Sequence, residues 1–268
     1  MLDIQLIRDH PDVIRQALRK RNDDPAIVDR VLAEDARWRD LLQSVEALRA
    51  ERNRVSKEIG RMRDKDERQA RIEEMRAVGD RLSALEDDLR EVEAQLHNDL
   101  LWIPNVPDDS SPVGPDESAN IEIRRWGTPR DFEAEGFHPV PHWDLGLELD
   151  ILDFERGVRL SGSRFYLLKG AGARLQRALI FWMLDVHTRE NGFSEVYLPF
   201  VVKRDMLVGA AQLPKFEDNL YRDVEDDLWL LPTAEVAITN LHRDEILDAE
   251  GLPLHYVAYT PCFRREKM

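Results

Sequence analysis

Between residues 31 and 96, positions that are mostly apolar recur within two stretches in alternating steps of three and four. The first stretch runs through Val31, Glu34, Trp38, Leu41, Val45, Leu48, Arg52, Val55, Ile59 and Met62. The second runs through Arg71, Met75, Val78, Leu82, Leu85, Leu89, Val92 and Leu96. A 3.5-residue period held over several heptads indicates a coiled-coil seam, and the polar segment RMRDKDERQAR between the two frames suits a turn. The pattern predicts an antiparallel helical hairpin over about residues 26–98, with arms of roughly 54 Å.

A short helix is predicted ahead of the hairpin, because Asp9 or His10 can cap a helix that starts at Pro11. Its apolar face would consist of Val13, Ile14, Ala17 and Leu18. Asp24 followed by Pro25 gives the same signal at the start of the first arm. Together with the hairpin, this helix forms a predicted N-terminal domain of residues 1–103.

Residues 104–120 are rich in Pro, Asp, Ser and Gly, which indicates a linker. In residues 121–268, β-like stretches alternate with helical ones. FYLLKG leads into a helix whose apolar stripe is Leu175, Leu179, Trp182 and Val186, with Gly192 as its C-terminal cap. The chain is therefore expected to be α+β, with a helical hairpin first and a mixed domain after it.

The composition and the N-terminal sequence bear on where in the cell the protein is located. The chain has 268 residues, a net charge of −15 and one cysteine, Cys262, so it can form no internal disulfide. The N-terminus lacks a signal-peptide pattern, and no apolar run approaches the roughly 18 residues of a membrane helix. No Cys/His cluster has metal-ligand spacing. These features favour a cytoplasmic protein without a membrane partner.

A basic stretch stands out in the acidic chain. Residues 49–63 carry six cations against Glu51 and Glu58, a local charge of +4. The cations are Arg49, Arg52, Arg54, Lys57, Arg61 and Arg63. One interpretation is the solvated flank of a coiled coil. The other is a rod that follows a nucleic-acid backbone, and the absence of aromatic residues there favours duplex RNA over single strands.

The segment LPLHYVAYTPCFRRE alternates with period two and is expected to be a strand. Arg264 and Glu266 would then share a face, with Arg265 on the opposite one. A surface ion pair is one interpretation. The other is a site for a ligand that carries both an anion and a hydrogen-bond donor, as nucleotides do.

The whole chain resembles the N-terminal part of a bacterial-type seryl-tRNA synthetase, a class II aminoacyl-tRNA synthetase. GFSEVYLPFVV resembles motif 1 and places Pro199 at the dimer interface. LPTAEVAITN resembles the family's Thr-x-Glu segment at the amino-acid pocket, and TPCFRRE resembles the start of motif 2. The hairpin followed by a class II core is similar to the family's arrangement, in which the arm grips tRNA(Ser).

The resemblance implies a partial class II domain with an antiparallel sheet flanked by helices, acting on ATP with Mg²⁺ and L-serine. Arg264 would bind the α-phosphate and help position the serine carboxylate, with Arg265 and Glu266 also at the ATP. Glu266 would accept from the adenine amino group. Thr233, Ala234 and Glu235 would hold the serine ammonium end, although a helix start capped by Thr233 explains the same residues.

The family continues past motif 2, so the chain as given is expected to be catalytically incomplete, with Mg²⁺ ligands outside it. The expected function is ATP-dependent ligation of serine to its tRNA by a homodimer. A non-catalytic tRNA-binding or dimer-forming relative is the alternative. A ligase that charges a carrier protein is disfavoured by the hairpin.

Overall fold

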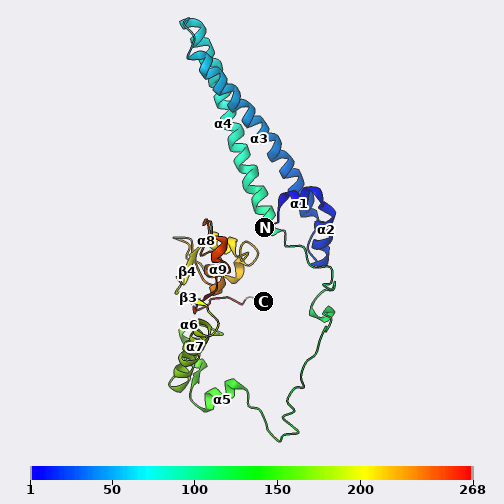
Figure 1. Cartoon of the computed structure of the whole chain (residues 1–268), viewed down its shortest axis with the longest axis vertical. Coiled ribbons are helices and arrows are strands. Elements are labelled where there is room, and N and C mark those ends of the chain that lie inside the picture. The colour runs from blue at the N-terminus through cyan, green and yellow to red at the C-terminus, as the bar shows by residue number, and fades with distance from the viewer. Residues whose placement is uncertain (1, 267–268) are drawn as a thin grey trace. The chain divides into compact units, whose positions relative to one another are not determined.

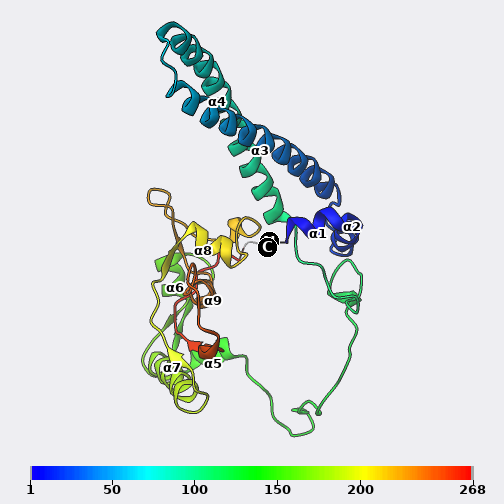
Figure 2. The same cartoon turned by 45° about the horizontal axis from the view of Figure 1, so that its top comes forward.

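The computed structural model describes residues 2–266 and divides into two units, Met1–Ile123 and Arg124–Met268. The first unit contains α1 (Ile4–Asp9), α2 (Pro11–Lys20), α3 (Ala26–Ile59), α4 (Lys65–Trp102) and a 3-10 turn at Glu117–Ala119. Helices α3 and α4 lie side by side and antiparallel (Figures 1 and 2). The predicted hairpin is confirmed, with arms of about 51 and 57 Å at 1.5 Å per residue.

The predicted seam lies at the interface of the two arms. Val31, Val45 and Val55 of α3 and Leu82 and Val92 of α4 are buried. Every other predicted position except Arg52 is at least partly buried. The 3.5-residue pattern therefore identified the contact face correctly.

The turn between the arms is shorter than the polar segment indicated. It occupies residues 60–64, and residues 65–71 already belong to α4. Asp64 begins α4 by accepting hydrogen bonds from the backbone N–H groups of Asp66 (2.9 Å) and Glu67 (3.0 Å). Because an N-cap carboxylate satisfies donors that the first turn leaves free, a polar sequence can begin a helix here.

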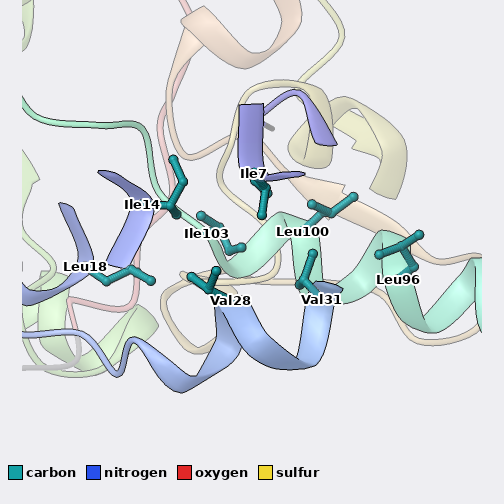
Figure 3. Packing of buried hydrophobic residues seen from close by; sticks show 8 residues of the cluster. All are labelled: Ile7, Ile14, Leu18, Val28, Val31, Leu96, Leu100 and Ile103. Atoms are coloured by element: carbon teal, nitrogen blue, oxygen red, sulfur yellow. The ribbon is translucent and has the colours of Figure 1, made fainter. Parts of the chain in front are cut away.

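A hydrophobic core joins the short helices to the base of the hairpin. Figure 3 shows the cluster, which consists of Ile7, Ile14, Leu18, Val28, Val31, Leu96, Leu100 and Ile103. The predicted helix from Pro11 is confirmed as α2, although Val13 is 45% exposed and lies off the buried face. Sequence reasoning missed α1, whose Ile7 is fully buried.

A buried carboxylate ties α1 to α3. Asp35 is 1% exposed and accepts two hydrogen bonds from Arg8, at 2.8 Å from Nε and 2.5 Å from Nη2, and one from Arg39. Burial acts to raise the pKa of Asp35, but the bonds and charges of Arg8 and Arg39 outweigh it, so the pKa lies below its ordinary value. The arginines thus keep the carboxylate charged inside the fold.

A second buried carboxylate, Asp99, ties α4 to α3 through Arg30. Glu34 lies near this pair, and its Oε2 is buried without a hydrogen-bond partner. Burial, and then the charge of Asp99, raise the pKa of Glu34. The charged form of Glu34 is therefore unfavourable in the folded hairpin base.

The second unit contains short strands and helices. They are α5 (His142–Glu148), β1 (Leu152–Asp153), α6 (Phe154–Ser161), β2 (Leu167–Leu168), α7 (Ala171–Arg189), β3 (Ser194–Glu195), β4 (Val201–Lys203), α8 (Arg204–Gly209), β5 (Leu228–Leu230), α9 (Ala234–Thr239) and β6 (Tyr256–Val257). Two 3-10 turns occur at Glu217–Asn219 and Ala249–Gly251. The α+β class is confirmed.

The strands of the second unit form three pairs. The β1–β2 and β4–β5 pairs are antiparallel, whereas β3 and β6 are parallel. The strand predicted over residues 252–266 is wrong in extent, because only Tyr256 and Val257 are in a strand and Glu266 has a left-handed φ of 47°. The resemblance implied one antiparallel sheet, whereas the described residues form three separate two-stranded sheets.

The core of the second unit is small. It consists of Val202, Leu207, Leu213, Leu220, Trp229, Leu231 and Val236. Helix α7 contributes no residue to this cluster. Three of the four residues of its predicted apolar stripe are exposed, Leu175 by 57%, Leu179 by 44% and Trp182 by 61%, whereas Val186 is partly buried. The C-cap of α7 is Glu190 rather than the predicted Gly192, which follows two residues later with a positive φ of 71°.

Candidate active site

A cavity of about 690 Å³ in the second unit is lined by four of the six residues expected to bind ATP or serine. Its lining includes Thr233, Arg264, Arg265 and Glu266, which come from separate parts of the sequence. The remaining lining residues are Ser163, Arg164, Phe165, Tyr166, Leu168, Gln176, Tyr221, Pro232, Cys262 and Phe263. The volume falls within the range of small-molecule sites.

Arg264 is held beside the start of α9. Its Nε donates to the carbonyl oxygen of Pro232 at 3.0 Å, and the preceding residue, Phe263, donates its backbone N–H to the oxygen of Leu231 at 2.8 Å. Because the anchor uses only Nε, the terminal nitrogens keep their donors for a ligand. Arg264 and Thr233 thus line the same cavity.

Arg265 does not point away from the cavity, as strict alternation predicted, but contributes to its lining. Its Nε donates to the oxygen of Leu220 at 2.8 Å, and its guanidinium lies 4.5 Å from the centroid of the Tyr221 ring. Its backbone N–H bonds to the oxygen of Asn219 at 2.9 Å. These contacts fasten the 263–266 segment to residues 219–221.

Glu266 also lines the cavity. Its left-handed backbone shows that it does not continue the predicted strand, in which it would have shared a face with Arg264. Its backbone oxygen accepts a hydrogen bond from Arg164. Of the described residues that line the cavity, Glu266 is the only carboxylate.

Thr233, Ala234 and Glu235 form the start of α9. The Thr233 hydroxyl accepts from the backbone N–H of Glu235 at 3.4 Å, so the capping interpretation describes the local structure. Thr233 lines the cavity, whereas Ala234 and Glu235 are not part of its lining and Glu235 is exposed.

The loop before β2 was missed by sequence reasoning. Ser163, Arg164, Phe165 and Tyr166 all line the cavity. The sequence GSRFY offered only a turn signal, glycine beside serine, and nothing in it pointed to the segment containing Arg264.

The basic residues of the arm fall into two groups. Arg49 pairs with Glu86 of α4, at 2.9 Å from Nε and 2.7 Å from Nη2 to the same oxygen. The other five are exposed, and the structure shows no ion pair for them within the described range. These five are Arg52, Arg54, Lys57, Arg61 and Arg63.

Pro199 lies between β3 and β4, exposed and outside the named strands. Tyr197 beside it is 84% exposed. Over residues 2–266, no helix is long and apolar enough to cross a membrane, and no group of three or more His, Cys, Asp or Glu side chains is placed to hold a metal ion.

Two parts of the chain match models of known protein families. Residues 1–107 match the seryl-tRNA synthetase N-terminal domain. Residues 215–268 match the tRNA synthetase class II core domain (G, H, P, S and T).

Curated relatives align along the whole chain. It is 62% identical over 268 residues to the serine--tRNA ligase of Roseiflexus sp. (strain RS-1) and 54% identical to that of Thermomicrobium roseum. These alignments cover 100% of this chain but 62% and 59% of the relatives. The chain therefore spans about three fifths of the length of the relatives that it matches.

Solved structures agree with the sequence relatives. Seryl-tRNA synthetase from Pyrococcus horikoshii, complexed with ATP, superposes with a TM-score of 0.81 at 36% identity, covering 99% of this chain and 64% of that one. The cytoplasmic enzyme from Naegleria fowleri, in complex with AMP, gives 0.76 at 28% identity and covers 99% and 60%. With its helical hairpin, its cavity and both domain matches, the chain belongs to the seryl-tRNA synthetase family.

Proposed function

We propose that this chain supplies the tRNA-binding arm and part of the serine-activating site of an ATP-dependent serine–tRNA ligase. The observation that carries the proposal is the cavity that Thr233, Arg264 and Glu266 line together. The family match and the ATP and AMP complexes of its structural neighbours support it. The substrates would be L-serine, ATP and tRNA(Ser).

In the proposed reaction, the serine carboxylate attacks the α-phosphate of ATP and pyrophosphate leaves, which gives seryl-adenylate. The terminal ribose hydroxyl of the tRNA then displaces AMP from the serine carbonyl. Negative charge grows on the phosphate oxygens during the first step. A guanidinium held in place before the reaction stabilises that charge without reorganisation.

Arg264 is assigned to the α-phosphate. Its fork binds two oxyanions in one plane and stays charged at any working pH. The bond to Pro232 holds the side chain while the terminal nitrogens remain available. Glu266 is assigned to the adenine amino group, and Thr233, Ala234 and Glu235 to the serine ammonium end.

Magnesium is expected with ATP, where it would offset phosphate charge and would usually be held by one or two protein carboxylates. Glu266 is the only carboxylate on the described cavity lining, and it is assigned to adenine. No residue of this chain is therefore assigned to Mg²⁺.

The arm is proposed to bind tRNA(Ser) through Arg52, Arg54, Lys57, Arg61 and Arg63, which are exposed on α3 and the turn after it. Arg49 belongs to the same basic stretch, but its pairing with Glu86 gives it a part in holding the arms together. A homodimer is proposed through the exposed face of α7 and the Pro199 segment. A cytoplasmic location agrees with the single cysteine.

The experiment compares two proteins in the charging of tRNA(Ser) with labelled serine. One is the 268-residue chain, and the other carries the C-terminal part of the Roseiflexus relative after residue 268. The extended chain is expected to charge the tRNA, and the shorter one to bind it without charging. If the extended chain binds tRNA but never charges it, the alternative of a non-catalytic tRNA-binding protein is supported instead.

A further inference from the structure

Three arginines line the cavity, and a main-chain carbonyl holds each of them. Arg264 and Arg265 donate from Nε to Pro232 and Leu220, and Arg164 donates from Nη1 to Glu266. No ion pair with a carboxylate is recorded for any of the three within residues 2–266. Some other arginines of this unit pair with carboxylates instead, as Arg159 does with Glu155 and Arg130 with Glu135. A neutral acceptor fixes a guanidinium without cancelling its charge.

The charge of the cavity is opposite to that of the chain. Its titratable lining includes three arginines and one carboxylate, Glu266, so these groups sum to +2 in a chain of −15. A concave site lined by one sign of charge focuses the field and concentrates counter-ions. The expected ligand of this cavity is therefore a polyanion.

Arg164 has a backbone conformation that disfavours its side chain. Its φ is 74°, in the left-handed region, and Gly162 two residues earlier has a φ of 92°. A non-glycine residue there costs free energy, and such strain is concentrated at sites where a side chain is needed. Glycine would adopt the same backbone without the cost.

We propose that Arg164 is a second phosphate-binding arginine of this site, beside Arg264, and contacts the triphosphate beyond the α-phosphate. The inference rests on the proposed function, which gives the α-phosphate to Arg264. Arg265 has its guanidinium against the Tyr221 ring and its Nε on Leu220. Arg164 uses one terminal nitrogen on a neutral oxygen, so its other donors are available to the β- and γ-phosphates.

Isothermal titration of ATP and AMP, each with the same Mg²⁺, into the 268-residue chain tests this assignment. Arg164→Asn removes the guanidinium, and asparagine tolerates a left-handed backbone. The matched control is Arg159→Asn, which removes the same charge from an exposed helix position. Arg164→Asn is expected to weaken ATP binding about tenfold or more and AMP binding by less than about twofold, because charged hydrogen bonds are lost only with ATP. Arg159→Asn should change neither.

A second variant separates binding from folding. Arg164→Gly removes the guanidinium and the backbone strain together, so it should melt no lower than Arg164→Asn while losing ATP affinity to the same extent. Unchanged ATP affinity in a folded Arg164→Gly chain, or equal losses for ATP and AMP, would overturn the inference and leave the proposed function standing. Failure of the unaltered chain to bind ATP would overturn the inference too. If ATP binds with the predicted losses but the extended chain charges no tRNA, the proposed function alone fails.

Discussion

Replacing Arg52, Arg54 and Lys57 with alanine is expected to flatten the salt dependence of tRNA binding. The three side chains are exposed on α3, and no ion pair is recorded for them in the part of the chain that the structure describes. Their charges are therefore available to neutralise phosphates. Each neutralised phosphate contributes about 0.9 to the slope of log affinity against log salt on a duplex. The triple variant should lower that slope by roughly 2 to 3.

The assay is tRNA(Ser) binding by fluorescence anisotropy at several salt concentrations, with the 268-residue chain and the triple variant. The charge-matched control replaces Arg130, Arg159 and Arg189, which are exposed and each paired with a carboxylate in the second unit. The control should keep the slope of the unaltered chain. A slope that stays the same in the arm variant, or that falls equally in the control, refutes the assignment of tRNA binding to the basic stretch.

Three further predictions concern stability and assembly. Asp35→Asn should lower the free energy of unfolding by about 1.5–3 kcal/mol at pH 7, because it removes a buried charged partner of Arg8 and Arg39. The folded pKa of Asp35 is depressed, so its stabilising contribution is present above its ordinary pKa near 3.9 and is lost as pH falls through the folded value. The free energies of unfolding of the variant and the unaltered chain, measured with chemical denaturant, should therefore converge at low pH. Glu34→Gln should raise the free energy of unfolding at pH 8 by roughly 0.5–1 kcal/mol, because burial raises the pKa of Glu34 and its charged form is unfavourable beside Asp99. An increase in the free energy of unfolding that is larger at pH 4 than at pH 8 would contradict this reasoning. Trp182→Asp on the exposed face of α7 should convert a homodimer of the extended chain into a monomer in light scattering, and a dimer that survives would place the interface elsewhere.

The hairpin could be predicted because its information is local. The seam positions recur along each arm, and burial of Val45, Val55 and Leu82 follows from that period alone. The long-range ties could not be predicted in the same way. Arg8 meets Asp35 across 27 residues and Arg30 meets Asp99 across 69, and no spacing rule connects such distant positions.

The candidate site was partly accessible from sequence. Period two and the family motif selected Arg264, Glu266 and Thr233, which line one cavity. The same period put Arg265 on the wrong face, because tertiary hydrogen bonds to Asn219 and Leu220 decide its direction rather than a regular strand. Arg164 could not be selected from the sequence, because its proposed role depends on a backbone turn and on a hydrogen bond to Glu266, 102 residues away.

Serine-dependent exchange of labelled pyrophosphate into ATP tests the central claim most directly, because it reports adenylate formation without tRNA. The extended chain is expected to catalyse exchange with serine and to lose roughly 10²–10³ of the rate in Arg264→Ala, the typical cost of removing one preorganised electrostatic donor. The 268-residue chain is expected to show no meaningful exchange, and Arg159→Ala in the extended chain should keep the full rate. Near-normal exchange by Arg264→Ala, or robust exchange by the 268-residue chain, would contradict the account.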